Sequence, residues 1–254
     1  MRLGRLPITL SAWLALGSVP VAVAADESLH RRQAKPGNAH YDGRFTTKRI
    51  KVEKTRREAL RVLIQTYLAT FESIGIETWL MHGSLLGWWW NKRVMPWDDD
   101  ADVMVSEPSM FLLAAYYNMT TYYYEYPAIP EGRSFLLDIN PHYLVRDKGK
   151  GLNSIDARWI DMDHGLFIDI TTARYNVTYG EGEGVLVGKD GHLFRDTYLL
   201  PLLETTFEGV KAKIPYKYKD FLISEYGKES LSDKEINNHH FDDDKMEWVP
   251  TGEL

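Results

Sequence analysis

Four aspartates within five positions lead directly into an apolar run, and this feature constrains the fold more than any other. Asp98, Asp99, Asp100 and Asp102 precede or begin residues 101–106, whose apolar and β-branched side chains predict a buried strand. In a strand, side chains two residues apart share a face, so Asp100 and Asp102 lie about 7 Å apart along the backbone. Half-buried carboxylates at this spacing repel one another. A divalent cation removes that repulsion; a solvent-exposed acidic turn is the alternative interpretation.

A single carboxylate interrupts a second apolar strand further along the chain. Residues 166–171 read Leu-Phe-Ile-Asp-Ile-Thr, so Asp169 stands alone among apolar neighbours. An unpaired buried carboxylate is costly, and such a group needs a proton or a charged partner. A metal ion shared with Asp100 and Asp102 is one such partner, and an ion pair with an arginine such as Arg158 is the other.

A Gly-Ser pair precedes the acidic cluster, at the junction of two predicted elements. Residues 76–81 form an apolar run typical of a buried strand, and residues 85–90 predict a short helix. Gly83 and Ser84 lie between them, where free backbone amides at a helix N-terminus bind phosphate groups. The sequence therefore predicts a phosphate site next to the predicted metal site.

The remaining pattern predicts an α/β fold, in which a mixed central sheet is flanked by helices. Apolar residues recur at helical spacing from Leu60 to Phe71, and Gly75 ends that helix. The glycine-rich residues 180–191 predict a hairpin or surface loop, since their acidic residues would repel a phosphate. Further strands are expected at 121–126, 135–139, 142–145 and 156–161, a hairpin at 207–214, and helices at 109–118 and 216–226.

This order of elements resembles the nucleotidyltransferase fold, in which three carboxylates hold Mg²⁺ or Mn²⁺ against the phosphates of a nucleotide. More narrowly, residues 82–87 (HGSLLG) with residues 96–102 (PWDDDAD) resemble the LicD/fukutin-related family of phosphotransferases. Three downstream segments fit the same family: 194–202, 207–210 and 226–227. The resemblance extends from about residue 60 to residue 228.

Within that family, two segments are most similar to fungal members related to the yeast mannosylphosphate-transfer proteins of the cell wall. These are the tryptophan tract at residues 88–90 and residues 155–161. The resemblance implies transfer of a phosphorylated group, such as mannose phosphate or a phosphocholine-like group, from a CDP- or GDP-linked donor. The acceptor is a hydroxyl of a glycan or glycoprotein. Asp99 departs from the family pattern, because many members carry a large apolar residue there.

The resemblance also implies roles for individual residues. Asp100, Asp102 and Asp169 are the expected catalytic carboxylates and ligands of Mg²⁺ or Mn²⁺, and Asp98 supports the same metal site. Asp169 acts either as the third ligand or as the base that accepts the acceptor's proton. Gly83 and Ser84 are expected to hold the donor phosphate.

Several cationic side chains are further candidates for contact with phosphate or acceptor. They are His82, Arg158, Arg195 and His164, and for each of them a structural role is an equal alternative. His239 and His240, followed by Asp242, resemble a metal cluster only superficially.

The ends of the chain predict export and a single folded domain. Residues 1–24 have the basic and apolar regions of a signal peptide, cleaved after Ala24 or retained as a signal anchor. A flexible leader at 25–48, a domain at 49–230 and a polar acidic tail at 231–254 follow. Asn118 and Asn176 begin N-glycosylation sequons, so the secretory pathway is the expected compartment.

Two other classes of function compete with an enzyme. One is a non-catalytic regulator of a mannosylphosphate transferase, and the other is a secreted carbohydrate-binding protein whose aromatic tracts face sugar. The formal charge of −6 and the lack of a basic stripe argue against nucleic acid as a partner, and no membrane contact is expected beyond a retained signal anchor. The chain has no cysteine, so neither a disulfide nor a thiolate-bound metal contributes.

Overall fold

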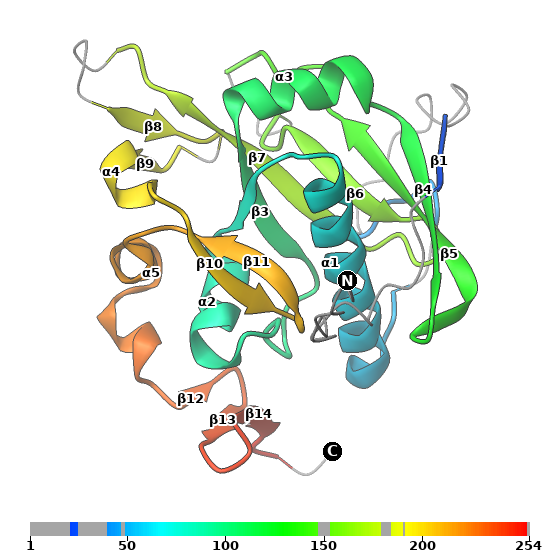
Figure 1. The fold of residues 1–254 in the computed structure, drawn as a ribbon. Coiled ribbons are helices and arrows are strands. Elements are labelled where there is room, and N and C mark those ends of the chain that lie inside the picture. The colour runs from blue at the N-terminus through cyan, green and yellow to red at the C-terminus, as the bar shows by residue number, and fades with distance from the viewer. Residues whose placement is uncertain are drawn as a thin grey trace, which may run out of the picture.

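A mixed sheet forms the centre of the computed structural model, which describes residues 21–24, 40–46, 49–146, 153–178, 184–189 and 191–252 (Figure 1). Its strands run in the order β1 (Val21–Ala24), β4 (Thr120–Tyr126), β5 (Ile129–Ile139), β6 (Ala157–Asp161), β7 (Phe167–Tyr175), β3 (Ala101–Ser106) and β2 (Thr78–Leu80). Two short strands, β8 (Val185–Val187) and β9 (Leu193–Arg195), extend the far end of β7. All neighbours are antiparallel except β3 and β7, which are parallel. The predicted mixed α/β fold is confirmed.

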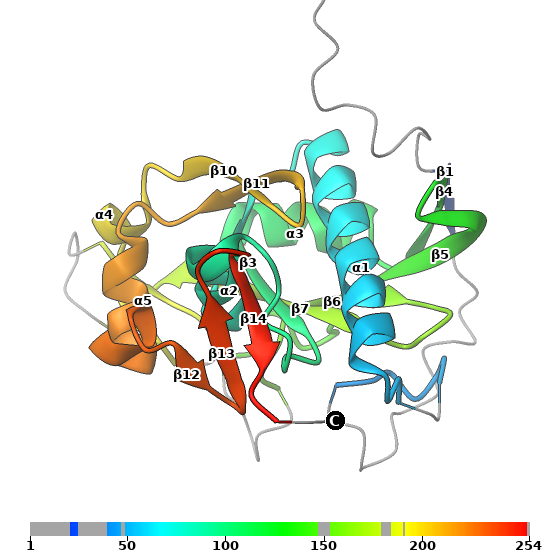
Figure 2. The ribbon, with the colours of Figure 1, turned by 90° about the horizontal axis from the view of Figure 1, so that it is seen from below.

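Helix α1 (Glu53–Ser73) covers one face of this sheet and packs against β6, β7 and the β10–β11 hairpin (Figures 1 and 2). Its apolar stripe is buried as the periodicity predicts, with Leu60, Leu63 and Phe71 fully inaccessible to solvent. Burial of each such side chain contributes about 2 kcal/mol. The helix ends before Gly75, which has a positive φ of 71°.

The other helices are short and connect the strands. They are α2 (His82–Asn91), α3 (Glu107–Tyr116), α4 (Asp196–Leu199), α5 (Tyr218–Tyr226) and the 3₁₀ helix η2 (Lys228–Leu231). Helix α3 begins at a side-chain cap, because the Ser106 hydroxyl accepts the backbone N–H of Ser109 at 3.3 Å. Helix α2 turns sharply into the following segment, and a Cβ on Gly87 would lie 2.2 Å from the carbonyl oxygen of Arg93. Only glycine allows that close approach.

A hairpin of β10 (Leu203–Phe207) and β11 (Val210–Ile214) follows α4 and confirms the hairpin predicted at 207–214, although its first strand begins earlier. Glu208 and Gly209 form the turn, both with positive φ. The strand expected at 142–145 is wrong. Those residues form a turn, because the side chain of Asn140 accepts the backbone N–H of His142 at 2.8 Å and its carbonyl accepts that of Tyr143.

The C-terminal residues differ from the polar tail predicted at 231–254. Strands β12 (Glu235–Ile236), β13 (His239–Asp242) and β14 (Glu247–Pro250) form a small antiparallel sheet beside α2 (Figure 2). Phe241 and Trp248 from this sheet pack against Trp90 and Met95 in a separate aromatic cluster. The acidic residues 242–244 lie at the turn between β13 and β14, so the polar composition describes the turn and not the sheet.

The flexible leader predicted at 25–48 is ordered where the structure describes it, at residues 40–46. Tyr41 is buried, and the backbone N–H of Asp42 donates to the carbonyl of Gly165 at 2.7 Å. Arg44 forms ion pairs with Asp42 and with Asp138 on β5. One aromatic anchor and one arginine between two carboxylates hold this segment, and a polar composition does not reveal them.

The turn between β6 and β7 is fixed by one buried carboxylate. Asp161 accepts the backbone N–H groups of Asp163 and His164 at 2.9 and 3.1 Å. It also bonds the His164 ring at 2.9 Å and Arg133 at 3.1 Å. His164 is therefore a structural residue of this turn, one of the two alternatives that the sequence leaves open for it.

Parts of the predicted organisation lie outside the described residues. They are residues 1–20 of the signal segment, residues 25–39 and 47–48 of the leader, residues 180–183 and 190 of the glycine-rich loop, and residues 253–254 of the tail. Residues 21–24 pair with β4. Within the described ranges, no helix combines the length and the apolar character needed to span a membrane.

Candidate active site at the carboxylate cluster

The carboxylate cluster consists of Asp98, Asp99, Asp100, Asp102 and Asp169. Two of its members, Asp102 and Asp169, lie side by side on neighbouring strands. In the parallel pair of β3 and β7, Asp102 is in register with Asp169. Neighbouring strands lie about 4.8 Å apart, and in-register residues of a parallel pair project from the same face. The carboxylates that the sequence separates by more than sixty positions are therefore immediate neighbours on one side of the sheet.

Arg158 lies on β6 in register with Asp169, so Asp102, Asp169 and Arg158 are neighbours on three adjacent strands. Its Nε donates to Oδ1 of Asp169 at 2.9 Å, and its guanidinium lies 3.8 Å from the centre of the Phe167 ring. The ion pair that the sequence left open for Asp169 is thus present. Burial raises the pKa of Asp169, while the charge of Arg158 acts in the opposite direction.

Asp98 and Asp102 have no ion-paired counter-charge, although the charge of His82 lowers the pKa of Asp102 and those of Arg56 and His40 lower the pKa of Asp98. Both are half-buried, and among the described residues neither carboxylate has a hydrogen-bonded or ion-paired partner. Burial, followed by repulsion from Asp100, raises the pKa of Asp102 to about 8. The same two causes raise the pKa of Asp98 to about 7. A neighbouring positive charge would stabilise both carboxylates in their ionised form.

The two middle aspartates of the cluster are each paired with a residue far away in sequence. His40 Nδ1 lies 2.8 Å from Oδ2 of Asp100, and Nε of Arg56 lies 3.1 Å from Oδ1 of Asp99. Arg56 thereby neutralises the carboxylate that departs from the family pattern. Sequence reasoning missed both partners, because His40 falls in the predicted leader and Arg56 lies one turn before the apolar stripe of α1, where no local pattern marks a site.

Gly83 and Ser84 lie in the first turn of α2, and each lies close to an aspartate of the cluster. The Ser84 hydroxyl accepts the backbone N–H of Asp102 at 2.9 Å, which ties the helix to β3. A Cβ on Gly83 would lie 3.3 Å from Oδ2 of Asp98, so glycine permits this carboxylate to approach the helix. No side chain caps the first turn of α2. Its free amides therefore present partial positive charge on the side where Asp98 lies.

Comparison with known proteins identifies the family of this chain. The chain matches the family described as "LicD/FKTN/FKRP, nucleotidyltransferase domain" over residues 75–217, which is more than half of its length. The chain belongs to the LicD family. Every residue of the carboxylate cluster, together with Gly83 and Ser84, falls inside the matched region.

Two yeast proteins are relatives of this LicD domain. "Mannosyltransferase regulator 4" of Saccharomyces cerevisiae is 37% identical over 142 residues, which are 55% of this chain and 12% of the relative. "Mannosyltransferase regulator 14" of the same organism is 38% identical over 112 residues, which are 44% of this chain and 12% of the relative. The matched parts are thus a small fraction of each relative's length.

A cavity of about 270 Å³ adjoins the cluster of the LicD domain through His82. His82 Nδ1 lies 2.7 Å from Oε1 of Glu225, and its charge favours ionisation of Asp102. Arg195 lines the same cavity, so two of the predicted phosphate contacts meet there. His164 and Arg158 are not among its lining residues.

Tyr226 is a further member of the site that sequence reasoning missed. Its hydroxyl is hydrogen bonded to Glu225, and burial raises its pKa, with contributions from the charges of Glu225, Asp102 and Asp98. The sequence placed this residue at the end of a helix and in a segment that fits the family, but assigned it no role, and folding brings that helix end to the carboxylates.

The donor atoms of the cluster fit a divalent cation in their chemistry. Carboxylate oxygens are the preferred ligands of Mg²⁺ and Mn²⁺. Asp98 and Asp102 are half-buried and, among the described residues, have no ion-paired partner, whereas Asp100 and Asp169 engage His40 and Arg158. As the side chains stand, no three His, Asp or Glu residues within the described residues are arranged to hold one ion. A metal would have to exchange at least one carboxylate away from its present cationic partner.

Proposed function

We propose that this LicD domain catalyses metal-dependent transfer of a phosphorylated group, such as mannose phosphate, from a nucleotide-activated donor to a hydroxyl of a glycan. The observation that carries the proposal is the adjacency of Asp102 and Asp169 on one face, with the unpaired carboxylate of Asp98 beside the open N-terminus of α2. Uncompensated carboxylates in a half-buried site cost stability, and a functional cation explains why they are tolerated.

Different residues of the chain would bind the metal and accept the proton. Asp98 and Asp102 would hold Mg²⁺ or Mn²⁺, and Asp100 or Asp169 would complete the ligand set. When bound, such an ion neutralises charge on the phosphate oxygens. Asp169, if it does not bind metal, would accept the proton of the attacking hydroxyl, and Arg158 would orient its carboxylate.

Donor phosphates would bind between the cluster and the adjoining cavity. The free amides of the first turn of α2 and the side chains of His82 and Arg195 are the groups on that side that favour anions. A CDP- or GDP-linked sugar is the expected donor, and a glycan or glycoprotein supplies the hydroxyl.

The test is a donor screen with purified full-length protein, reading released nucleoside monophosphate in the presence of Mg²⁺ or Mn²⁺. Asp102→Asn and Asp169→Asn should each lower the rate by about a thousandfold, since each removes charge stabilisation at the reacting phosphate. Asp243→Asn, an exposed aspartate at the β13–β14 turn, is the matched control and should leave the rate unchanged. Full activity in either cluster variant would refute the proposal.

A non-catalytic regulator is the second candidate, favoured by the names of the two yeast relatives and by the ion pairs that occupy Asp100 and Asp169. Calorimetry separates the two. If the domain is an enzyme, the wild-type protein should bind a GDP- or CDP-sugar only when Mn²⁺ is present. In the Asp102→Asn variant, Mn²⁺ should no longer promote that binding. A regulator should show no metal-dependent donor binding, and a carbohydrate-binding protein should bind glycan without nucleotide.

We further propose that the domain works in the lumen of the secretory pathway. Asn118 is exposed and Asn176 is half-exposed, so both sequons are accessible at the surface. Expression through a eukaryotic secretory pathway should yield a glycoprotein whose mass falls on glycosidase treatment. The double variant Asn118→Gln with Asn176→Gln should lack that shift, and an unmodified wild-type protein would contradict the proposal.

A further inference from the structure

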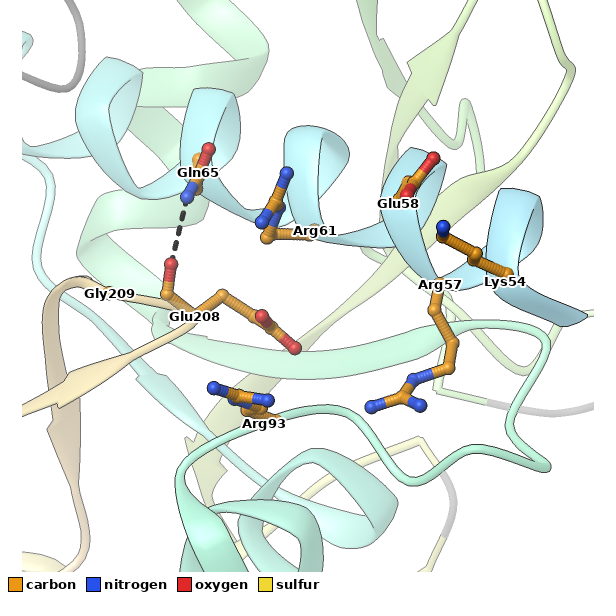
Figure 3. Close-up of a pocket in the computed structure, with 8 residues that line it drawn as sticks. All are labelled: Lys54, Arg57, Glu58, Arg61, Gln65, Arg93, Glu208 and Gly209. Carbon is orange, nitrogen blue, oxygen red and sulfur yellow. Dashed lines mark hydrogen bonds between the residues drawn. The ribbon is translucent and has the colours of Figure 1, made fainter. Parts of the chain in front are cut away.

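A second and larger cavity lies between α1, the segment that follows α2 and the β10–β11 turn (Figure 3). Its volume is about 530 Å³, within the range of small-ligand sites. The lining residues are Lys54, Arg57, Glu58, Arg61, Gln65, Arg93, Glu208 and Gly209. None of them belongs to the carboxylate cluster, so this cavity is a separate feature of the molecule.

One wall of the cavity is a polar stripe of α1. Its five members fall at positions i, i+3, i+4, i+7 and i+11 and are Lys54, Arg57, Glu58, Arg61 and Gln65. A stripe of this kind is usually the solvated face of an amphipathic helix. Here two charged side chains from other elements, Arg93 and Glu208, face the stripe from the opposite side, as Figure 3 shows. Three segments distant in sequence thus converge on one polar hollow.

The charges in the cavity are unbalanced, with four cations against two carboxylates. Within the described part of the chain, Lys54 and Arg61 form no hydrogen bond or ion pair. Arg57 has only a distant ion pair, 3.9 Å, with Glu53 on its own helix. Arg57 and Arg61 are four residues apart on one face, and like charges at this spacing destabilise a helix. A bound anion would relieve that repulsion.

Hydrogen bonds hold the opposite wall in place. The backbone N–H of Val94 donates to Oε1 of Glu208 at 2.8 Å, and Nε2 of Gln65 donates to the Glu208 carbonyl at the same distance. Gln65 in turn accepts the hydroxyl of Tyr126 at 3.0 Å. The Glu208 carboxylate is therefore a fixed acceptor opposite the cations of α1 and is suited to a ligand hydroxyl.

The side chains present select the class of ligand. Guanidinium groups match phosphate oxygens with paired N–H donors, and carboxylates accept the hydroxyls of a sugar. A nucleotide base would require a stacking surface, and no aromatic residue is among the described residues that line the cavity. Phosphate and sugar hydroxyl together describe a phosphorylated sugar.

We propose that this cavity binds a phosphorylated sugar unit of a glycan. The site goes beyond the proposed transfer reaction and does not require it, because a regulator that recognises phosphorylated glycan would use the same residues. The cavity adjoins the loop that leads into the carboxylate cluster. Arg56 on α1 donates to the Pro96 carbonyl at 2.8 Å and pairs with Asp99, and Val94 of the same loop holds Glu208.

Calorimetry on the full chain tests the proposal with three probes: mannotriose carrying one phosphomonoester, unmodified mannotriose and inorganic phosphate. The wild-type protein should bind the phosphorylated trisaccharide more tightly than either other probe. The double variant Lys54→Gln with Arg61→Gln should weaken that binding at least about tenfold, the value of a charge-assisted hydrogen bond. Lys228→Gln makes the same lysine replacement at an exposed site on η2 and should have no effect.

Two further variants make the result specific. Glu208→Gln keeps an acceptor for Val94 but removes a negative charge, so it should tighten binding of inorganic phosphate, an effect that a damaged fold cannot produce. Asp102→Asn should leave this affinity unchanged, so failure of the proposed reaction and failure of this site are distinguishable. Wild-type affinity in the double variant would overturn the proposal. So would equal binding of unmodified mannotriose, or of inorganic phosphate alone, to the wild-type protein.

Discussion

At the scale of single residues, the four aspartates of one short segment fall into two groups. Asp99 and Asp100 are paired with Arg56 and His40, while Asp98 and Asp102 have no ion-paired partner among the described residues. The identical side chains are thus distinguished by what folding brings to them. The unpaired carboxylates are the ones whose pKa values rise furthest, and a binding site for a cation is most plausible where that cost is largest.

The raised pKa of Asp102 predicts a pH dependence of stability. Between its unfolded value of 3.8 and its folded value of about 8, the folded metal-free protein holds a proton that the unfolded chain does not. The free energy of unfolding therefore falls as the pH rises through this interval. Asp102→Asn should remove this part of the fall and unfold at a higher temperature than the wild type near pH 8.

Thermal denaturation with a chelator checks this expectation, and the difference between the two proteins should shrink toward about pH 5. Asp98 titrates in the same direction, so a smaller slope should remain in the variant. Added Mn²⁺ should stabilise the wild type more than the variant at the higher pH. Parallel pH profiles for the two proteins would contradict the assignment of a strained carboxylate.

At the scale of elements, the short segment at residues 40–46 links the chain before α1 to the central sheet. Tyr41 is only 2% exposed, and its hydroxyl accepts the backbone N–H of Ile50 at 3.2 Å. Through His40 the same segment reaches Asp100. Its stability thus bears on the position of one carboxylate of the cluster.

Tyr41→Ala should lower the free energy of unfolding by about 3 kcal/mol, because it removes a buried aromatic ring and leaves a cavity. Tyr116→Ala on α3, where the side chain is 76% exposed, is the matched control and should change stability by no more than about 0.5 kcal/mol. Denaturant titration measures both. Equal stability of the two variants would show that residues 40–46 do not hold the chain to the sheet.

The elements that could be predicted from sequence are those whose signal is local. The apolar stripe of α1, the strand that follows the aspartates and the turn at Gly209 each carry their own periodicity or turn residue. Residues 142–145 also include apolar side chains that suggest a strand. There the side chain of Asn140 accepts the backbone N–H of His142, and the segment forms a turn. A side chain that competes for backbone hydrogen bonds outweighs a weak strand pattern.

The candidate site was only partly predictable for the same reason. The adjacency of Asp102 and Asp169 follows from two apolar strands that each carry one carboxylate. His40, Arg56 and Tyr226 have no such marker, because each comes from an element whose own pattern gives no sign of the site. Contacts between distant segments are fixed by packing, which a single sequence does not display.

At the scale of the whole molecule, the C-terminal sheet completes the fold and is not an appendage. Phe241 and Trp248 close a cluster with Trp90 of α2, and the ring centres of Trp90 and Trp248 are 4.8 Å apart. Trp97, just before the aspartates, also contacts Trp248. The last residues of the chain therefore support the helix and the loop on which the carboxylate cluster depends.

Trp248→Ala should lower the free energy of unfolding by about 4 kcal/mol, since it empties the centre of this cluster. Met246→Ala, at a residue that is 53% exposed in the neighbouring turn, serves as the control and should be nearly neutral. Thermal denaturation, with tryptophan fluorescence as a second probe, measures the difference. A Trp248 variant as stable as the control would mean that the C-terminal sheet is only loosely attached.

The buried carboxylate of Asp161 has a consequence for how this protein can evolve. The turn it braces sets the phase of β7, and side chains along a strand alternate between its two faces. Inserting or deleting one residue there would rotate Ile168 or Ile170 into the place of Asp169 and expel the carboxylate to the far side. Relatives that keep carboxylates at the positions of Asp102 and Asp169 should therefore have the same number of residues between Asp161 and Asp169. The lengths of their other loops should vary freely.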